Sequence, residues 1–175
     1  MIVTVSGLPG SGTTTLAKRL SDAYDLEYVS GGDVFREEAE RRGVSVGEFN
    51  LMVEEEPEID RELDERQTEI ARERDDVLLE SRLAGHMAGE HADLRVWLKA
   101  SEDVRAERVA ERESVSVEDA LLKSREREAS EAKRYMDLYD IDVSDLGVYD
   151  LVVDTERWDA DGVEVVVSAA LEGLP

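Results

Sequence analysis

Gly7-Leu8-Pro9-Gly10-Ser11-Gly12-Thr13-Thr14 is the stretch that decides the fold. It follows a β-branched run at residues 2–5, which predicts a strand, and it precedes apolar residues at helical spacing, among them Leu16 and Leu20. Glycines between a strand and a helix let backbone N–H groups turn inward around phosphates, and the helix adds its positive dipole end. The stretch therefore predicts a phosphate-binding loop, with a glycine-rich turn that binds nothing as the alternative.

This loop departs from the usual G-x-x-x-x-G-K-[ST] pattern at one position. Thr13 stands where a lysine normally reaches the β- and γ-phosphates, and Thr14 stands where a hydroxyl ligates Mg²⁺. Two hypotheses follow: other cations replace the lysine in a closed state, or the loop binds nucleotide without transferring phosphate. The residues expected to contact the nucleotide are Gly7, Leu8, Pro9, Gly10, Ser11, Gly12, Thr13, Thr14 and Thr15.

Strand and helix signals alternate along the rest of the chain. Strands are predicted at residues 28–30, 77–79, 94–98 and 151–153, and helices within 33–74 and over 101–113, 116–139 and 161–171. Crossovers long enough to hold a helix imply a mainly parallel sheet of five strands between two helical layers, an α/β fold. The ligand should lie beyond the carboxyl ends of the strands. A length of 175 residues with 41% hydrophobic residues suits one domain over 1–175.

Composition narrows the class of protein. The net charge of -23 is spread along the chain, which speaks against nucleic-acid binding. With only four lysines among the 21 basic residues, it favours adaptation to high salt over an ordinary acidic protein. No apolar run approaches the roughly 20 residues that span a bilayer, and no signal-peptide layout is present, so we expect a soluble cytoplasmic protein. The absence of cysteine excludes disulfides and thiolate chemistry.

Charged residues follow the strand at 77–79 and recur on a later helix. Glu80 and Arg82 should point into the predicted cleft, where Glu80 could orient the water shell of Mg²⁺ and Arg82 could grip an acceptor phosphate. The alternative is a helix-capping pair. Arg127, Glu131 and Arg134 lie on one helical face by their spacing, although a solvated, salt-bridged face has the same pattern.

Strand, glycine loop, helix, strand and then Gly32-Asp33-Val34-Phe35-Arg36 together resemble the nucleoside monophosphate kinases. The resemblance implies that Arg36 grips the acceptor phosphate and that Asp33 helps to hold Mg²⁺ through water. Without the loop upstream, the same two residues would be an ordinary i,i+3 surface pair.

Residues 7–154 are similar to the archaeal cytidylate kinases, which also have threonine at the lysine position. The similarity includes Thr13-Thr14-Thr15, Glu80-Ser81-Arg82-Leu83-Ala84-Gly85, Lys133-Arg134-Tyr135 and Tyr149-Asp150-Leu151. It implies a P-loop kinase that moves the γ-phosphate of ATP onto CMP or dCMP with Mg²⁺. An acceptor-binding helical subregion at about 33–74 and a short lid at about 105–134 go with it. The arginine, acid, arginine triplet at 127, 131 and 134 is similar to one in the bacterial cytidylate kinases.

These observations give a set of expected site residues. The catalytic residues are Arg36, Arg82, Arg112, Arg127 and Arg134; the acceptor is bound by Ser30, Asp33, Arg36, Arg82 and Glu131; Mg²⁺ is bound by Thr14, with Asp33 and Glu80 acting through water. Arg108, Arg112 and Arg125 are candidates to supply the missing lysine charge from the lid. His86 and His91 lack a third ligand, so we expect them to be structural or exposed.

Alternatives remain for the activity. AMP or UMP as acceptor would need only a different base pocket, and Thr13 favours a nucleotide-binding module without transfer. A P-loop GTPase is less favoured because no N-K-x-D run is present. The expected partners are ATP and CMP alone, with no nucleic acid and no membrane, and the protein is expected to be a monomer.

Overall fold

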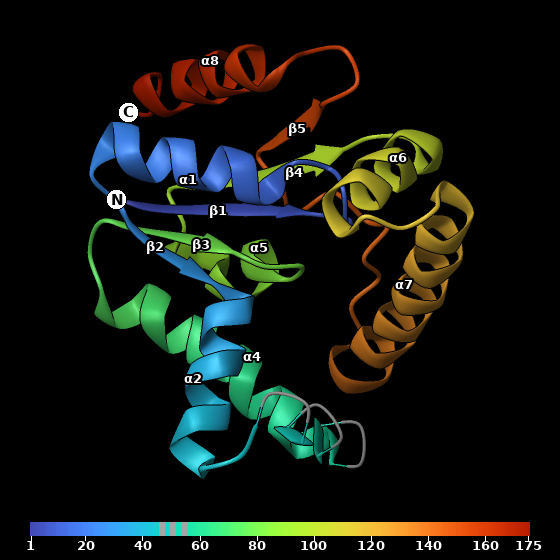
Figure 1. Cartoon of the computed structure of the whole chain (residues 1–175). Helices are drawn as coiled ribbons and strands as arrows, with labels where there is room; N and C mark the ends of the chain where they lie inside the picture. The colour runs from blue at the N-terminus through green and yellow to red at the C-terminus, as the bar shows by residue number, and fades with distance from the viewer. Residues whose placement is uncertain (46–47, 50–51, 54–55) are drawn as a thin grey trace.

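Five strands form a parallel sheet with the order β2-β3-β1-β4-β5 (Figure 1). The computed structural model describes residues 1–45, 48–49, 52–53 and 56–175. The strands are β1 (Ile2–Gly7), β2 (Glu27–Ser30), β3 (Val77–Glu80), β4 (Leu94–Lys99) and β5 (Leu151–Asp154). In the centre of the sheet, Val3 of β1 pairs with Leu78 of β3 on one side and with Leu94 of β4 on the other. The predicted α/β fold is therefore confirmed.

Helices cover both faces of the sheet and the carboxyl ends of its strands. They are α1 (Thr13–Tyr24), α2 (Gly31–Arg42), α4 (Pro57–Glu73), α5 (Ala84–Ala88), the 3₁₀ turn η1 (Gly89–His91), α6 (Glu102–Glu113), α7 (Val117–Tyr139) and α8 (Ala160–Glu172). Figure 1 shows α1 and α8 on one face, α4 and α5 on the other, and α6 with α7 beside the carboxyl ends of the strands. This arrangement places the loop after β1 between the sheet and α6.

The central strands are buried on both faces. In β3, Leu78 packs with the core under α1 and α8, whereas its neighbours Val77 and Leu79 pack with the core under α4 and α5. All three side chains are at most 1% exposed. A strand covered on both sides needs apolar residues at every position, which explains the absence of alternation in residues 77–79.

Side-chain caps fix where several helices begin. The hydroxyls of Ser30, Ser101 and Ser116 and the carboxylate of Asp159 each accept a hydrogen bond from a backbone N–H in the first turn of the following helix. Ser45 and Glu48 form a capping box, because each side chain accepts a hydrogen bond from the other residue's N–H. Parts of the predicted helical region 33–74, namely residues 46–47, 50–51 and 54–55, lie outside the described residues.

The segment that contains α5 and η1 was not predicted as helical. Its five-residue helix is too short to show a periodic pattern, and glycine stands at positions 85 and 89. His86 is partly buried, with its ring edge-on to Tyr149 at 5.9 Å between ring centroids, and His91 lies at the exposed end of η1. Across the residues the structure describes, no group of three or more His, Cys, Asp or Glu is placed to hold a metal ion.

Two further findings concern apolar residues. Trp97 is 5% exposed in β4 and packs on Tyr149, so it belongs to the core. Among the described helices, none combines the length and the apolar character that crossing a membrane requires.

Candidate active site

The loop between β1 and α1 depends on two glycines with left-handed backbone. Gly10 has φ of +82° and Gly12 has φ of +97°. At Gly10 a Cβ atom would lie 2.5 Å from the carbonyl oxygen of Arg105, so only glycine lets α6 approach the loop this closely. At Gly12 the space is open, and the backbone angle alone favours glycine.

The described part of the loop leaves polar groups without partners. Gly12 occupies the N-cap of α1, and no side chain among the described residues caps this helix. The hydroxyl of Ser11 is fully buried and likewise has no hydrogen-bond partner among the described residues. Unpaired N–H groups and a buried hydroxyl at the positive end of a helix suit an anion such as a phosphate.

Two arginines of α6 hold the outer side of the loop. Arg105 is 6% exposed, and its Nη1 donates to the carbonyl oxygen of Pro9 at 3.2 Å while it also pairs with Glu128 of α7. The Nη1 of Arg108 donates to the carbonyl oxygen of Gly10 at 3.2 Å. Arg105 was not predicted from the sequence, because its contact with Pro9 joins residues 96 positions apart.

The contacts of Arg108 differ from the sequence expectation. It was expected in a lid over the transferred phosphate, but its guanidinium group bonds the Gly10 carbonyl and both the hydroxyl and the carbonyl of Thr155. These contacts tie the loop to the segment after β5. In this structure Arg108 therefore braces the loop from the side.

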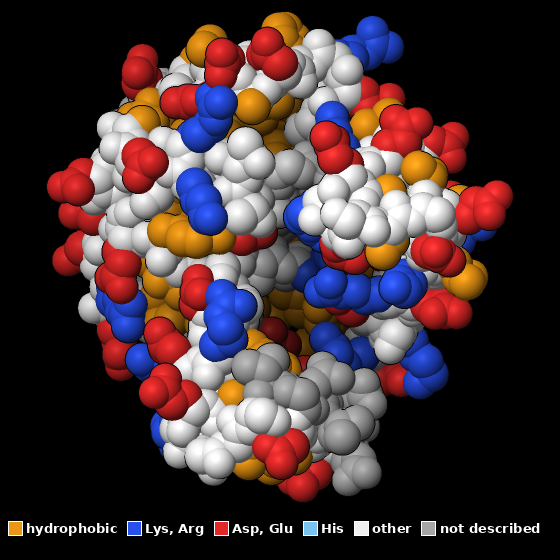
Figure 2. Space-filling model, in the orientation of Figure 1, with side chains coloured by type: hydrophobic (Ala, Val, Ile, Leu, Met, Phe, Trp, Pro, Cys, Tyr) orange, Lys and Arg blue, Asp and Glu red, His pale blue; other side chains and the backbone are white. Residues whose placement is uncertain are grey.

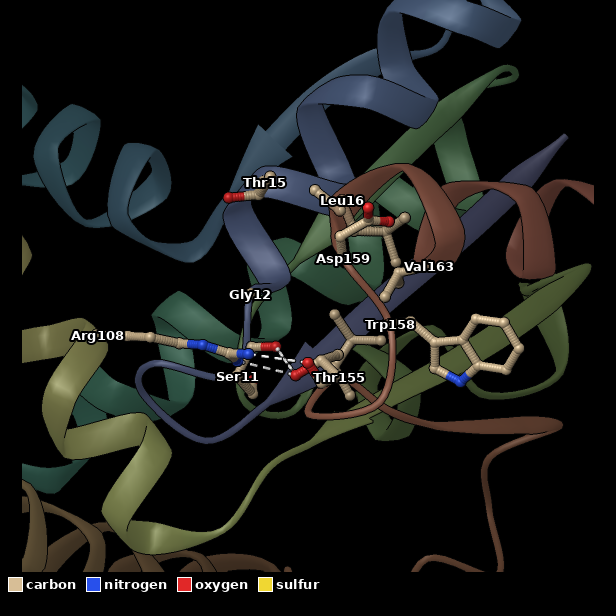
Figure 3. Close-up of a pocket in the computed structure, with 11 residues that line it drawn as sticks. Ser11, Gly12, Thr15, Leu16, Arg108, Thr155, Trp158, Asp159 and Val163 are labelled. Atoms are coloured by element: carbon tan, nitrogen blue, oxygen red, sulfur yellow. Dashed lines mark hydrogen bonds between the residues drawn. The ribbon is translucent and has the colours of Figure 1, made fainter.

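A pocket of about 250 Å³ lies beside the loop (Figure 3). Its lining residues are Ser11, Gly12, Thr15, Leu16, Leu98, Arg108, Thr155, Trp158, Asp159, Ala160 and Val163. Figure 3 shows Arg108 and Trp158 on opposite sides with Thr155 between them. The walls are mostly apolar, and a guanidinium group can stack on a flat ring. The pocket therefore suits an aromatic base. Trp158, to which the sequence analysis assigned no role, lines this pocket.

Three hydroxyl groups converge on Glu80 at the carboxyl end of β3. Its carboxylate accepts from the hydroxyls of Thr13 at 2.8 Å, Thr14 at 3.2 Å and Tyr28 at 2.7 Å. Burial, together with the bond to Glu80, raises the pKa of Tyr28, so its hydroxyl remains a donor. A carboxylate and a threonine hydroxyl this close are oxygen ligands of the kind that Mg²⁺ prefers.

Arg82 joins the loop to α7. Its side chain is 10% exposed, its Nη1 donates to the carbonyl oxygen of Gly7, and its Nε donates to Glu131 at 2.8 Å. The other Glu131 oxygen accepts from Arg127 at 2.7 Å. Burial would raise the pKa of Glu131, but Arg82 and Arg127 outweigh it and hold the pKa below its usual value. Three of the predicted site residues thus form one network beside the loop.

The remaining predicted residues lie in separate groups. Ser30 and Asp33 form the capping box of α2, and Asp33 also pairs with Arg36, whose side chain is 61% exposed. The bond from Ser30, with help from Arg36, holds the pKa of Asp33 below its usual value. Arg112 pairs with its neighbour Glu113 at the surface.

Arg125, like Arg112, is paired at the surface. It bonds Glu102 through two hydrogen bonds of 2.6 Å and is 59% exposed. Figure 2, drawn in the orientation of Figure 1, shows a hollow in the face toward the viewer, with Lys and Arg side chains along its walls.

Polar contacts connect α4 to the end of α7. Arg134 Nε lies 3.1 Å from a carboxylate oxygen of Asp60, and the Tyr139 hydroxyl donates to Asp64 at 2.8 Å. Burial raises the pKa of both acids, that of Asp64 to about 6. No sequence signal marked Asp60 or Asp64, because acids on a charged helix usually face solvent.

The model of the cytidylate kinase-like family matches residues 2–157. The chain belongs to this family. Curated proteins named cytidylate kinase share 56% identity in Haloarcula marismortui, 50% in Pyrococcus horikoshii and 49% in Methanocaldococcus jannaschii. These alignments cover 98%, 99% and 99% of this chain, and 90%, 90% and 99% of the respective relatives.

Solved structures support the fold of this cytidylate kinase-like protein. An uncharacterized protein from Eubacterium ventriosum superposes with a TM-score of 0.76 at 18% identity, covering 99% of both chains. Shikimate kinase from Bacteroides thetaiotaomicron superposes with a TM-score of 0.66 at 17% identity, covering 98% of both chains. At these identities the likeness shows the fold alone.

Gly10→Ala should weaken ATP binding. The added Cβ would press on the Arg105 carbonyl, and overpacking of about 1–3 kcal/mol would distort the loop. We expect ATP affinity, measured by titration calorimetry, to fall by at least about fivefold, since each 1.4 kcal/mol is tenfold. Gly43→Ala is the matched control, because Gly43 has φ of +71° and open space around it. Equal ATP affinity in both variants would contradict the packing of α6 on the loop.

Asp64→Asn should change how stability depends on pH. The pKa of Asp64 rises from 3.8 when unfolded to about 6 when folded, so the unfolded chain loses its proton first as pH increases. The free energy of unfolding of the natural protein therefore falls by about 1 kcal/mol between pH 5 and 7.5 through this group. The neutral amide removes that fall. The free energy of unfolding is measured with urea at both pH values for the natural protein, Asp64→Asn and the exposed control Asp22→Asn. Identical pH dependence in all three proteins would refute the prediction.

Proposed function

We propose that this protein transfers the γ-phosphate of ATP to CMP, and to dCMP, giving ADP and the cytidine diphosphate. One observation carries the proposal: Arg82, expected on the acceptor side, donates to the carbonyl of Gly7 in the phosphate loop. Such a contact suits two phosphate chains meeting end to end. Membership of the cytidylate kinase-like family and relatives of that name at about half identity support the same activity.

On the donor side, the loop residues 7–15 hold the triphosphate and the pocket between Arg108 and Trp158 holds the adenine. The pocket opens directly beside Ser11 and Gly12, so a base and its phosphates can lie continuously along it. Thr14 would ligate Mg²⁺ directly, with Glu80 and Asp33 acting through water. When bound there, the ion would neutralise charge on the β- and γ-phosphates.

On the acceptor side, Arg36 and Arg82 grip the phosphate of CMP from two directions. Ser30 and Asp33 support Arg36, and Glu131 orients Arg82 through its 2.8 Å bond. Arg127 and Arg134 extend the same basic wall along α7. Helices within 33–74 then form the acceptor-binding part of a single domain.

The reaction itself is an in-line displacement. A phosphate oxygen of CMP attacks the γ-phosphorus, the bond from that phosphorus to the oxygen bridging the β-phosphate breaks, and ADP leaves with the electron pair. No general base is required, since the attacking oxygen is already anionic at neutral pH. The arginines position both phosphates and neutralise charge as it shifts, and closure of the lid at 105–134 excludes water.

Exposed arginines of the lid supply charge that a P-loop lysine would otherwise bring. Arg112 and Arg125 are at least 59% exposed in their pairs with Glu113 and Glu102. Exposed ion pairs contribute little, about 0–1 kcal/mol, so both guanidinium groups can exchange their partners for phosphate oxygens.

The second candidate function is nucleotide binding without phosphate transfer. Thr13 favours it, because this residue stands where a lysine normally reaches the phosphates.

We expect this protein to be a monomer in the cytoplasm, since its substrates, ATP and nucleoside monophosphates, are small and soluble. The charge of -23 supports work at high salt, where self-repulsion is screened. The deciding experiment follows ADP formation from ATP and Mg²⁺ with CMP, dCMP, UMP or AMP, at low and at molar KCl. Transfer to CMP and dCMP supports the proposal. Transfer to AMP or UMP alone names another acceptor, and ATP binding without any diphosphate product establishes the binding module.

Arg36→Ala should raise the KM for CMP by at least about tenfold, because it removes charge-assisted bonds to the acceptor phosphate worth about 1.5–3 kcal/mol. ATP affinity, measured by calorimetry without CMP, should stay unchanged. Arg41→Ala is the matched control, since Arg41 lies on the same helix, is 71% exposed and pairs with Glu38. Equal losses of ATP and CMP binding in Arg36→Ala would count against this role.

A further inference from the structure

The carboxylate of Glu80 is held by hydroxyl groups from two elements, one for each of its oxygens. Oε1 accepts from Thr13 at 2.8 Å and from Thr14 at 3.2 Å, both at the start of α1. Oε2 accepts from Tyr28 of β2 at 2.7 Å. An ionised carboxylate offers about four acceptor sites on its two oxygens. The hydroxyls of the described residues therefore fill both sites on Oε1 and leave one on Oε2.

These bonds orient the carboxylate without neutralising it. Arg82 follows Glu80 by two residues but pairs with Glu131. Arg36, at the start of α2, pairs with Asp33. Hydroxyl donors carry no charge, so the negative charge of Glu80 stays available to a cation or to the water that a cation binds.

Packing fixes the side chain of Thr13 as well as its hydrogen bond does. Its methyl group lies so close to Gly7 that a Cβ atom added at Gly7 would be 2.9 Å from it. A β-branched side chain has few χ1 rotamers, and with the methyl group against Gly7 the hydroxyl is directed to Glu80. A lysine at this position would carry a charged group on a flexible stem. The short threonine side chain instead bonds the neighbouring carboxylate.

Tyr28 reaches the other oxygen of Glu80 from the edge strand. It pairs with Leu78 in the sheet, and Glu80 lies two residues further along β3, on the same face. The ring of Tyr28 packs against the core that contains Leu78. The ring is thus anchored in the core, and the hydroxyl at its end meets the carboxylate.

We propose that Thr13 and Tyr28 are positioning residues, one for each oxygen of Glu80, and that they fix the direction in which this carboxylate accepts from water bound to Mg²⁺. The inference rests on the proposed function, in which Glu80 acts on the ion through water. It gives a role to threonine at the place that a lysine usually occupies: its side chain serves the metal side of the site, whereas its backbone N–H still belongs to the phosphate loop.

Tyr28→Phe removes one hydroxyl and keeps the ring in the core. Mn²⁺ is the spectroscopic probe, and its affinity for the complex of protein and ADP is measured by electron paramagnetic resonance. Partners of a metal's own ligands typically carry about 10–100-fold of metal affinity, and Tyr28 acts one bond further out, so we expect a loss of at least about threefold. ADP affinity in EDTA should not change. Tyr24→Phe is the matched control, because the Tyr24 hydroxyl donates elsewhere, to the carbonyl of Ser168 at 3.5 Å.

A pair of substitutions at Thr13 separates the hydroxyl from the shape of the side chain. Thr13→Val keeps the branched shape without the donor, and it should also lose at least about threefold of the Mn²⁺ affinity. Thr13→Ser keeps the donor, so it should lose less than Thr13→Val. Equal losses in the two variants would show that packing against Gly7 matters and the bond to Glu80 does not, which would overturn the role of Thr13.

Both residues act through Glu80, so their effects should vanish with its carboxylate. In Glu80→Ala, the addition of Tyr28→Phe or Thr13→Val should cause no further loss of Mn²⁺ affinity, whereas independent residues would give additive losses. Thermal unfolding identifies which variants fold. Unchanged Mn²⁺ affinity in either folded single variant, or losses that add to that of Glu80→Ala, would overturn the inference while leaving the proposed function intact. Absence of CMP phosphorylation by the natural protein would instead refute the proposed function.

Discussion

Two guanidinium groups from α6 hold the backbone carbonyls of the phosphate loop, and the rest of the site depends on this contact. In a trans peptide the C=O and N–H groups point in opposite directions. When Arg108 and Arg105 bind the carbonyls of Gly10 and Pro9, the N–H of Gly10 is turned away from α6. These two hydrogen bonds therefore fix the shape of the loop from the side of α6. Glycine at position 10 is what allows the approach, since any Cβ there would collide with α6.

Further contacts of the same kind connect the loop to α7. Arg105 pairs with Glu128 of α7, and Arg82 pairs with Glu131 one turn further along the same helix. Both arginines also bond loop carbonyls, those of Pro9 and Gly7. A movement of α7 would therefore also displace the loop. Buried, multiply bonded pairs of this kind transmit position well, whereas the exposed pairs of Arg112 and Arg125 are free to change partners.

Local sequence patterns were enough for the framework and insufficient for the contacts that complete the site. β-branched runs, glycine punctuation and helical spacing located every strand and the long helices, because these signals act within a few residues. The short helix α5 was missed, since five residues carry no period. Arg108 was expected in the lid, and Arg105, Trp158 and Asp60 were not singled out at all. Their positions follow from tertiary contacts between distant segments, and nothing near them in the chain distinguishes them from other charged or apolar surface residues. The site roles assigned to Arg36, Arg82, Arg127, Glu131 and Arg134 remain predictions.

The central claim is that ATP and the acceptor meet end to end at one edge of the sheet. The most direct measurement is the affinity of a single molecule that joins adenosine to cytidine through a chain of five phosphates, determined by calorimetry and by competition. The proposed geometry predicts binding far tighter than that of ATP or CMP alone, with displacement of both nucleotides at once. Binding no tighter than that of ATP, with CMP still able to bind beside it, would contradict the claim.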